Sequence, residues 1–239
     1  MTTGYEDEWS KVYGHDRDPV RNHLVYPLID AWLDRWAPQT WIDAGCGNGG
    51  LIAHAQDRAF VKAYGLDLSD EFLDQARAHV RDSRVEFRKA DLREDWPVPA
   101  GEADAVVSVF VLNEIDDLTS VACAMAASLR PEGRGLLVMT HPFQILHERV
   151  AAPKVPKISG NLDYFGNDEL VYHFSLSDAT ASYFHHNLDD STAAFAAAGL
   201  TLHRIHELTP NEALLAAESA YADRVGHPLY IAFEVVRDD

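Results

Sequence analysis

Three acidic residues follow apolar segments of this chain and could together hold a polar ligand. Asp43 lies in TWIDA just before the glycine-rich GCGNGG, Asp67 ends the next apolar segment, and Asp91 ends the one after that, in KADL. Glycines let the backbone turn sharply and approach a ligand closely. A helix that follows such a loop directs free N–H groups back at it. The expected chemistry is the binding of a nucleoside cofactor.

The glycine loop alone fits two cofactor classes. Gly45, Gly47 and Gly50 satisfy G-x-G-x-x-G, the short fingerprint of nicotinamide dinucleotide enzymes. Asp43 favours another ligand, because a carboxylate there repels a pyrophosphate and attracts an amino group or a sulfonium. Both cofactor classes place an acidic residue such as Asp67 on the ribose hydroxyls.

Apolar and amphipathic segments alternate along the chain, which predicts alternating strands and helices. Strands are expected at 40–44, 61–68, 84–92, 103–112, 133–141, 200–208 and 228–238. Helices are expected from Pro19 to Trp36, after the glycines to about Arg58, and at 69–80, 118–130, 189–200 and 210–225. This order predicts right-handed crossovers and an α/β, Rossmann-like, doubly wound sheet in a single domain.

Local residue types indicate where the helices begin, bend and end. Ser69 is an expected N-cap, and another cap is expected near Asp190. Pro131 is expected to stop the helix at 118–130, and Pro27 to kink or split the first helix. Pro210 is expected in the first turn of the helix at 210–225.

Two segments depart from the alternation. The first 38 residues (1–38) are expected to form a helical cap over the cofactor. Residues 142–187 interrupt the alternation with prolines, glycines and mixed segments. A connection of this length inside a compact domain usually serves a function. We expect it to be a lid or part of the substrate pocket.

Composition narrows the function classes. The chain has 20 Lys and Arg against 38 Asp and Glu, a formal net charge of −18. Nucleic-acid binders usually present a basic face, so a small-molecule substrate is expected rather than a nucleic acid. The two cysteines show no disulfide or zinc spacing, and no metal is expected. No apolar run is long enough for a bilayer, which predicts a soluble, cytoplasmic protein with no membrane partner.

The order of these motifs resembles that of the class I S-adenosylmethionine-dependent methyltransferases of the small-molecule type. The resemblance rests on WIDAGCGNGG, LDLS and the helix after it, KADL, VVSVFVLNEI and SLRPEGRGLLVMTH. It is close over 1–141 and looser over 182–238. It implies a seven-stranded sheet, mostly parallel, whose last strand is antiparallel and inserted beside the fifth.

The resemblance also implies a cofactor, S-adenosyl-L-methionine, and a set of residues that would bind it. Asp43 and the backbone of Gly45, Cys46 and Gly47 would hold the methionine part, and Asp67 the ribose. The remaining members would surround the adenosine and the sulfonium: Leu68 and Phe72 beside the adenosine, Asp91 and Leu92 at the adenine, Phe110 and Val111 near the sulfonium, and Tyr13 over it.

Methyl transfer sometimes needs a base, and histidine is a natural one near neutral pH. His141 stands at the expected carboxyl end of the fifth strand, where ligands bind in open α/β sheets. His185 and His186 return to this end of the sheet, and in an extended segment only one of them can face the pocket. All three are candidate bases.

The leading hypothesis is methyl transfer to an oxygen, nitrogen or carbon atom of a small molecule. One alternative is an NAD-dependent oxidoreductase. Another is a protein of the same fold with a non-catalytic role, or one that uses the bound sulfonium for chemistry other than methyl transfer. The oligomeric state is not predicted.

Overall fold

A computed structural model describes residues 18–143, 157–160, 163–166, 169–173 and 180–238. The strands are β1 (Thr40–Ala44), β2 (Lys62–Asp67), β3 (Val85–Lys89), β4 (Ala103–Val109), β5 (Leu129–Thr140), β6 (Lys157–Ser159), β7 (Glu169–His173), β8 (Thr180–Phe184), β9 (Leu200–Leu208) and β10 (Tyr230–Arg237). The helices are η2 (Arg21–Val25), α2 (Tyr26–Trp36), α3 (Gly50–Ala55), α4 (Asp70–His79), η3 (Leu112–Glu114), α5 (Leu118–Ser128), α7 (Leu188–Ala197), α8 (Glu212–Ala217) and η4 (Ser219–Arg224).

Seven strands form the central sheet in the order β3-β2-β1-β4-β5-β10-β9. The strands from β3 to β5 pair in parallel, whereas β10 is antiparallel to both β5 and β9. This confirms the predicted α/β, Rossmann-like sheet with its last strand inserted beside the fifth. It differs from the 3-2-1-4-5-6 order of the dinucleotide-binding fold.

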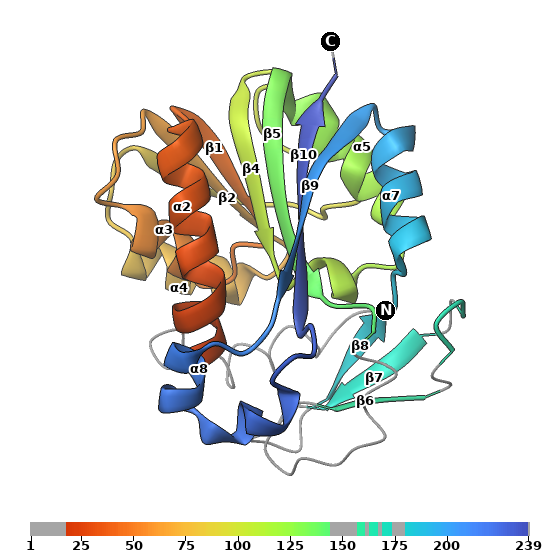
Figure 1. Cartoon of the computed structure of the whole chain (residues 1–239). Coiled ribbons are helices and arrows are strands. Elements are labelled where there is room, and N and C mark those ends of the chain that lie inside the picture. The colour runs from red at the N-terminus through yellow and green to blue at the C-terminus, as the bar shows by residue number, and fades with distance from the viewer. Residues whose placement is uncertain (1–17, 144–156, 161–162, 167–168, 174–179, 239) are drawn as a thin grey trace.

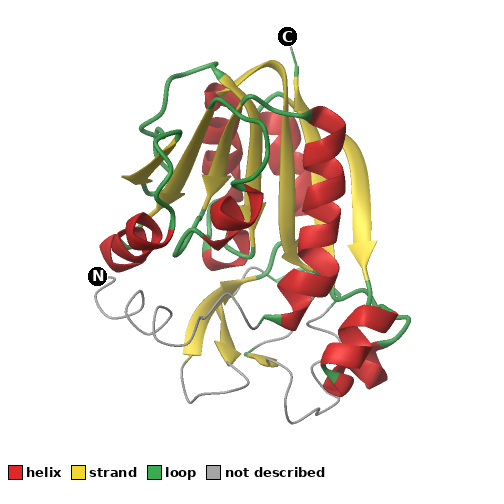
Figure 2. Cartoon of the chain, turned by 90° about the vertical axis from the view of Figure 1, so that its left-hand side faces the viewer, coloured by secondary structure: helices red, strands yellow, loops and turns green. Residues whose placement is uncertain are grey.

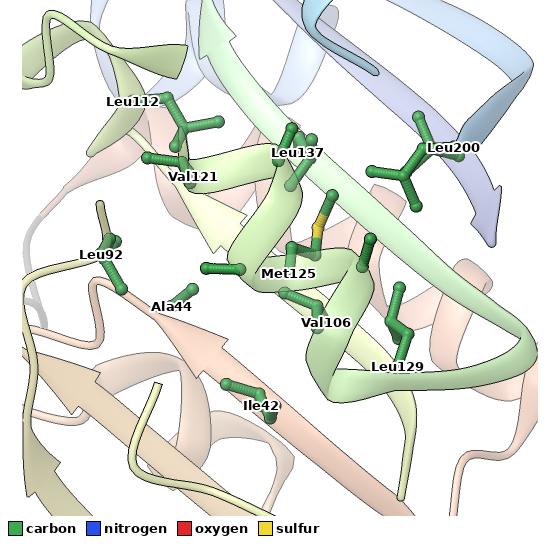
Figure 3. Close-up of a cluster of buried hydrophobic side chains, with 14 of the residues drawn as sticks. Ile42, Ala44, Leu92, Val106, Leu112, Val121, Met125, Leu129, Leu137 and Leu200 are labelled. Atoms are coloured by element: carbon green, nitrogen blue, oxygen red, sulfur yellow. The ribbon is translucent and has the colours of Figure 1, made fainter. Parts of the chain in front are cut away.

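Helices cover both faces of the sheet (Figure 1). One buried cluster joins α2 and α3 to the sheet, and a second joins α5 and α7 to the opposite face. Figure 3 shows part of the second cluster, in which Val121 and Met125 of α5 pack with Val106 and Leu137 of the sheet. Burial of these apolar side chains fixes the strands whose carboxyl ends form the site.

The segment expected to be a lid contains strands of its own. Strands β6, β7 and β8 form a separate antiparallel sheet. It lies beyond the carboxyl ends of the parallel strands, on the same side of the molecule as α8 (Figures 1 and 2). The sequence did not predict this sheet.

The first helix is continuous across Pro27, with one wide turn before it. Five residues, Arg21–Val25, are in π-helical conformation and lead directly into α2. Pro27 has no N–H to donate to the carbonyl of His23. The Asn211 side chain donates to that carbonyl instead, with Nδ2 at 2.9 Å from the oxygen. Asn211 also caps α8 by accepting from the Leu214 N–H at 2.8 Å.

The two roles of Asn211 can be separated by substitution. Asn211→Asp and Asn211→Ser keep an oxygen that caps α8 but remove the amide that reaches His23. We expect each to lower the free energy of unfolding by about 1 kcal/mol, the usual net value of one hydrogen bond. Urea denaturation measures this loss. Wild-type stability in both variants would contradict the role of the Asn211 amide.

Several helix ends differ from the prediction. The helix after the glycines ends at Ala55, earlier than about Arg58. Asn187, not Asp190, caps α7 by accepting from the N–H of residue 190 at 2.9 Å. The segment 210–225 divides into α8 and η4, and Pro210 precedes the first of them. The Ser69 cap is confirmed, since its side chain accepts from the Phe72 N–H.

Pro131 does not stop a helix. The helix α5 ends at Ser128, and Pro131 lies inside β5. There the pairing with β4 shifts register, from Ala103 opposite Leu129 to Ala105 opposite Arg134. The bulge tolerates a residue that cannot donate to the ladder.

Candidate cofactor and acceptor site

The glycine loop turns tightly between β1 and α3. Gly45 and Gly47 have positive φ, 81° and 51°, which glycine adopts without strain. The N–H groups of Gly45 and Cys46 both donate to the Leu66 carbonyl, at 2.8 and 2.9 Å, and so tie the loop to β2. A Cβ at Gly45 would lie 2.6 Å from the Val111 side chain. The loop is therefore built without side-chain bulk where it faces the end of β4.

Asp43 is a buried carboxyl group whose hydrogen-bonding capacity is not filled by the described residues. Its side chain is at the end of β1 with 2% of the residue exposed. One carboxylate oxygen, Oδ2, has no hydrogen-bond partner among the described residues. Burial, together with the nearby charge of Asp67, raises the pKa of Asp43 to about 8, although Arg21 opposes the shift. A cationic group bound here would compensate the charge.

Asp67 stabilises the glycine loop as well as facing the site. Its Oδ2 accepts from the Gly47 N–H at 2.8 Å, and its Oδ1 accepts from the Ser69 N–H at 3.0 Å. Burial raises its pKa, and these backbone donors oppose the rise. An ionised carboxylate has about four lone-pair sites, and the Leu68 N–H also acts on this one, so acceptor capacity remains for a bound hydroxyl group.

The residues expected around the adenosine lie beyond Asp67. Leu68 is 39% exposed, unusual for its size, and Phe72 of α4 is partly exposed. Asp91 follows β3, and Arg93 donates to both of its carboxylate oxygens, at 3.0 and 2.7 Å. These bonds lower the pKa of Asp91 and keep it ionised. The Leu92 side chain is buried in the core.

The end of β4 forms the other wall. Phe110 has a φ of 63°, a conformation that costs about 1–3 kcal/mol and is concentrated at functional sites. Its ring centroid lies 4.7 Å from that of Tyr230 on β10. The Arg21 guanidinium stands 5.5 Å from the Phe110 centroid. The start of the first helix, β4 and β10 therefore converge beside the glycine loop.

The structure distinguishes the three candidate histidines. His141 is 1% exposed, with Nε2 at 3.1 Å from Glu207 Oε1 and Nδ1 accepting from the Phe143 N–H at 3.2 Å. His186 Nε2 lies 2.8 Å from the Ile115 carbonyl. His185 turns the other way, with Nε2 at 3.0 Å from the Tyr164 carbonyl. The two consecutive histidines thus face different surroundings.

Some expected members lie elsewhere or cannot be placed. Cys46 is buried, and burial raises the pKa of its thiol, so only its backbone lines the loop. Tyr13 lies outside the described residues. The sequence reasoning missed Arg21, because only the packing of the first helix brings it near Asp43. It also missed Tyr164, whose contact with His185 is made through the main chain.

The described residues contain neither a cluster of metal ligands nor a membrane-spanning helix. No group of three or more His, Cys, Asp or Glu residues within the described ranges could hold a metal ion. No described helix is long and apolar enough to cross a membrane.

Comparison with known proteins agrees with this geometry. Residues 42–133 match the family described as "Methyltransferase domain". The ubiquinone biosynthesis O-methyltransferase of Aromatoleum aromaticum is 33% identical over 117 residues, which cover 47% of this chain and 50% of that protein. The chain thus matches about half the length of this curated relative.

Solved structures resemble the chain over nearly its whole length. An S-adenosylmethionine-dependent methyltransferase from Mesorhizobium loti has a TM-score of 0.69 and 20% identity, covering 94% of this chain and 100% of its own. A geranyl diphosphate C-methyltransferase from Streptomyces coelicolor, solved with S-adenosyl-L-homocysteine, has a TM-score of 0.62 and 19% identity, covering 99% and 100%. At these identities the likeness establishes the fold.

Proposed function

Because residues 42–133 match the family described as "Methyltransferase domain", we propose that the chain is a class I methyltransferase that transfers the methyl group of S-adenosyl-L-methionine to a small molecule. The observation that carries this proposal is the Asp43 carboxylate, buried and with Oδ2 unpartnered in the described structure. A bound ammonium group would favour the ionised form of this carboxyl, whereas a pyrophosphate brings no cation to it, so an NAD-dependent reaction fits the site poorly.

The side chains divide the cofactor among them. Asp43 would accept a hydrogen bond from the amino group of the methionine part. Arg21, whose charge acts on Asp43, would face the carboxylate of the methionine part. Asp67 would hold the two ribose hydroxyls. Leu68 and Phe72 would flank the adenosine, and Asp91 with Leu92 would meet the adenine. When bound, the cofactor supplies an electrophilic methyl group on a sulfonium.

The acceptor side would be formed by residues 142–187, with Phe110 and Val111 between the two ligands. The rings of Phe143 and Tyr164 lie 5.3 Å apart and those of His141 and Phe143 also 5.3 Å apart, so an aromatic wall borders this region. Aromatic side chains are typical of the lining of small-molecule sites. Residues 1–38 would cap the cofactor, and the acidic net charge supports a metabolite rather than a nucleic acid as the acceptor.

Calorimetric titration of the purified chain with S-adenosylmethionine, S-adenosylhomocysteine and NADH tests the proposal. We expect saturable binding of the two adenosyl ligands. Asp67→Ala should weaken it by at least about 10- to 100-fold, the range for losing one hydrogen bond to a charged group. Binding of NADH without binding of either adenosyl ligand would refute the assignment.

A matched ligand separates ribose recognition from disruption of the loop. The 2′-deoxy analogue of S-adenosylhomocysteine should bind the wild type less tightly than the parent does. In Asp67→Ala this penalty should largely disappear, because the partner of the hydroxyl is gone. Asp104→Ala is the control substitution. Asp104 accepts from Thr40 at the opposite end of the sheet, so the variant should bind both ligands like the wild type.

A further inference from the structure

The ring nitrogens of His185 are in unequal surroundings. Nε2 lies 3.0 Å from the carbonyl oxygen of Tyr164, which can only accept a hydrogen bond. Nε2 must therefore carry the proton, and in the neutral ring Nδ1 is left with a lone pair. Nδ1 is buried and has no hydrogen-bond partner among the described residues. The residue as a whole is 4% exposed.

An unpartnered buried nitrogen needs an explanation, because most buried polar atoms in proteins are paired. His141 uses Nε2 towards Glu207 and Nδ1 towards Phe143. His186 is bound to the main chain of η3. Burial lowers the pKa of His185 below its usual value, so the ring is neutral at pH 7 and able to accept a proton.

His185 is also held close to the methyl-transfer region. Asn113, in η3, donates from Nδ2 to the Phe184 carbonyl at 3.3 Å and accepts at Oδ1 from the Thr140 N–H at 2.9 Å. One side chain thus joins the ends of β4, β5 and β8. Val111, two residues before Asn113, packs directly against Gly45 of the cofactor loop.

Resting on the proposed function, we propose that His185 is the general base of the reaction, acting through Nδ1, and that the acceptor is a hydroxyl group. As the acceptor oxygen forms its bond to the methyl carbon, the carbon–sulfur bond breaks and its electron pair goes to sulfur. The hydroxyl proton passes to Nδ1, which leaves an imidazolium.

The acceptor class follows from the need for a base. A neutral hydroxyl is a weak nucleophile until its proton is removed, and positioned proton removal contributes about 10²- to 10⁴-fold. A neutral amine, a thiolate or a thioether attacks through a lone pair that is already available. A neutral imidazole whose free nitrogen lies at this end of the sheet is therefore matched to a hydroxyl. The Tyr164 carbonyl fixes the tautomer and acts as a positioning group.

The test uses His185→Gln, with the same change at His79, an exposed histidine at the end of α4, as the matched control. Glutamine can keep the amide donor that meets a carbonyl in place of Nε2, but has no basic nitrogen in place of Nδ1. The probes are simple phenols of graded acidity, with S-adenosylmethionine labelled in its methyl group. We expect His185→Gln to bind the cofactor like the wild type and to lose about 10²- to 10⁴-fold in kcat on weakly acidic phenols. His79→Gln should keep kcat within about threefold.

A pH profile distinguishes a base from a structural residue. Once the pH exceeds the pKa of the phenol, no proton remains to be removed, so the deficit of His185→Gln should shrink towards wild-type activity. A deficit that stays constant across phenols and pH would overturn the proposal. So would methylation of amines, thiols or carbon acceptors with none of phenols. Cofactor binding is measured separately from these rates. If the wild type binds the adenosyl ligands but the His185 experiments fail, only the assignment of the base is wrong. If the wild type binds no adenosyl ligand, the proposed function and the assignment of the base are both wrong.

Discussion

Replacing Asp43 by asparagine is expected to abolish cofactor binding while making the ligand-free protein more stable. The carboxylate is 2% exposed, and one of its oxygens is unpartnered in the described structure. Asparagine keeps its size but cannot carry the negative charge that offsets the ammonium group of S-adenosylmethionine. Losing one partner of a buried, hydrogen-bonded charge pair costs about 2–5 kcal/mol, so affinity should fall at least 30-fold in calorimetry.

The stability gain should depend on pH. The folded state holds the Asp43 proton with a pKa of about 8, against an ordinary value of 3.8. Folding therefore opposes ionisation, and the penalty is absent below about pH 4, grows as the pH rises, and is complete above about pH 8. The neutral amide of the Asp43→Asn variant carries no such penalty. At pH 8 we expect the variant to exceed the wild type by roughly 5 kcal/mol in urea denaturation, since a shift of about four pKa units is worth about 1.36 kcal/mol per unit, with the difference vanishing near pH 4.

Cofactor binding by the wild type should release a proton. At pH 7 the free carboxyl is mostly protonated, and a bound ammonium favours the ionised form. Titrations in two buffers of different ionisation enthalpy should show release approaching one proton. Asp104→Asn, the same change at the other end of the sheet, should leave this release unchanged. Cofactor binding by the wild type without proton release would contradict the assigned state of Asp43.

Replacing Gly45 by alanine is expected to remove cofactor binding through a purely steric effect. The residue has a φ of 81°, and a Cβ there would lie 2.6 Å from Cγ1 and 2.7 Å from Cβ of Val111. Rotation of the valine cannot relieve a clash with its own Cβ, so the loop itself must shift. The displaced Gly47 N–H would then lose its bond to Asp67. We expect affinity for S-adenosylhomocysteine to fall more than 100-fold, since misplacement by about 1 Å has effects of this size.

Gly199→Ala is the matched control for the cost of placing alanine at a positive φ. Gly199 has a φ of 69°, but nothing lies within 4 Å of a Cβ built there. Both alanines therefore adopt a left-handed conformation that costs roughly 1–2 kcal/mol, and only the one at position 45 adds overpacking of roughly 1–3 kcal/mol. Urea denaturation should rank Gly45→Ala as less stable than Gly199→Ala, and the latter should bind the cofactor normally. Equal free energies of unfolding for the two variants would show that the glycine loop shifts without cost and so relieves the clash with Val111.

The central sheet could be predicted from the sequence because its signals are local. A strand such as Thr40–Ala44 is a short buried run, and the cap at Ser69 depends on residues within one turn. The exceptions depend on partners distant in the chain. Pro131 is tolerated by a bulge against β4. The cap of α7 is itself local, since Asn187 accepts from the N–H of residue 190, and the prediction near Asp190 misplaced this cap by three residues.

The site was predictable only where one element supplies both the residue and its position. Asp43 and Asp67 each follow from a strand end, whereas the electrostatic effect of Arg21 on Asp43 requires the first helix to pack on the sheet. The state of His185 is set by the main-chain carbonyl of Tyr164, and a carbonyl leaves no mark in the sequence. Its role, like those of His141 and His186, stays a prediction until the variants are measured.

The antiparallel strand β10 determines when the site can be completed. It lies between β5 and β9, so β9 pairs with no other strand of the central sheet. It also follows the other six strands of the central sheet in the chain, and domains form from the N-terminus as the chain emerges from the ribosome. A nascent chain can assemble β1 to β5 early, but Tyr230 reaches Phe110 and Glu207 reaches His141 only after β10 has inserted. Cofactor binding during synthesis would therefore report the insertion of the final strand.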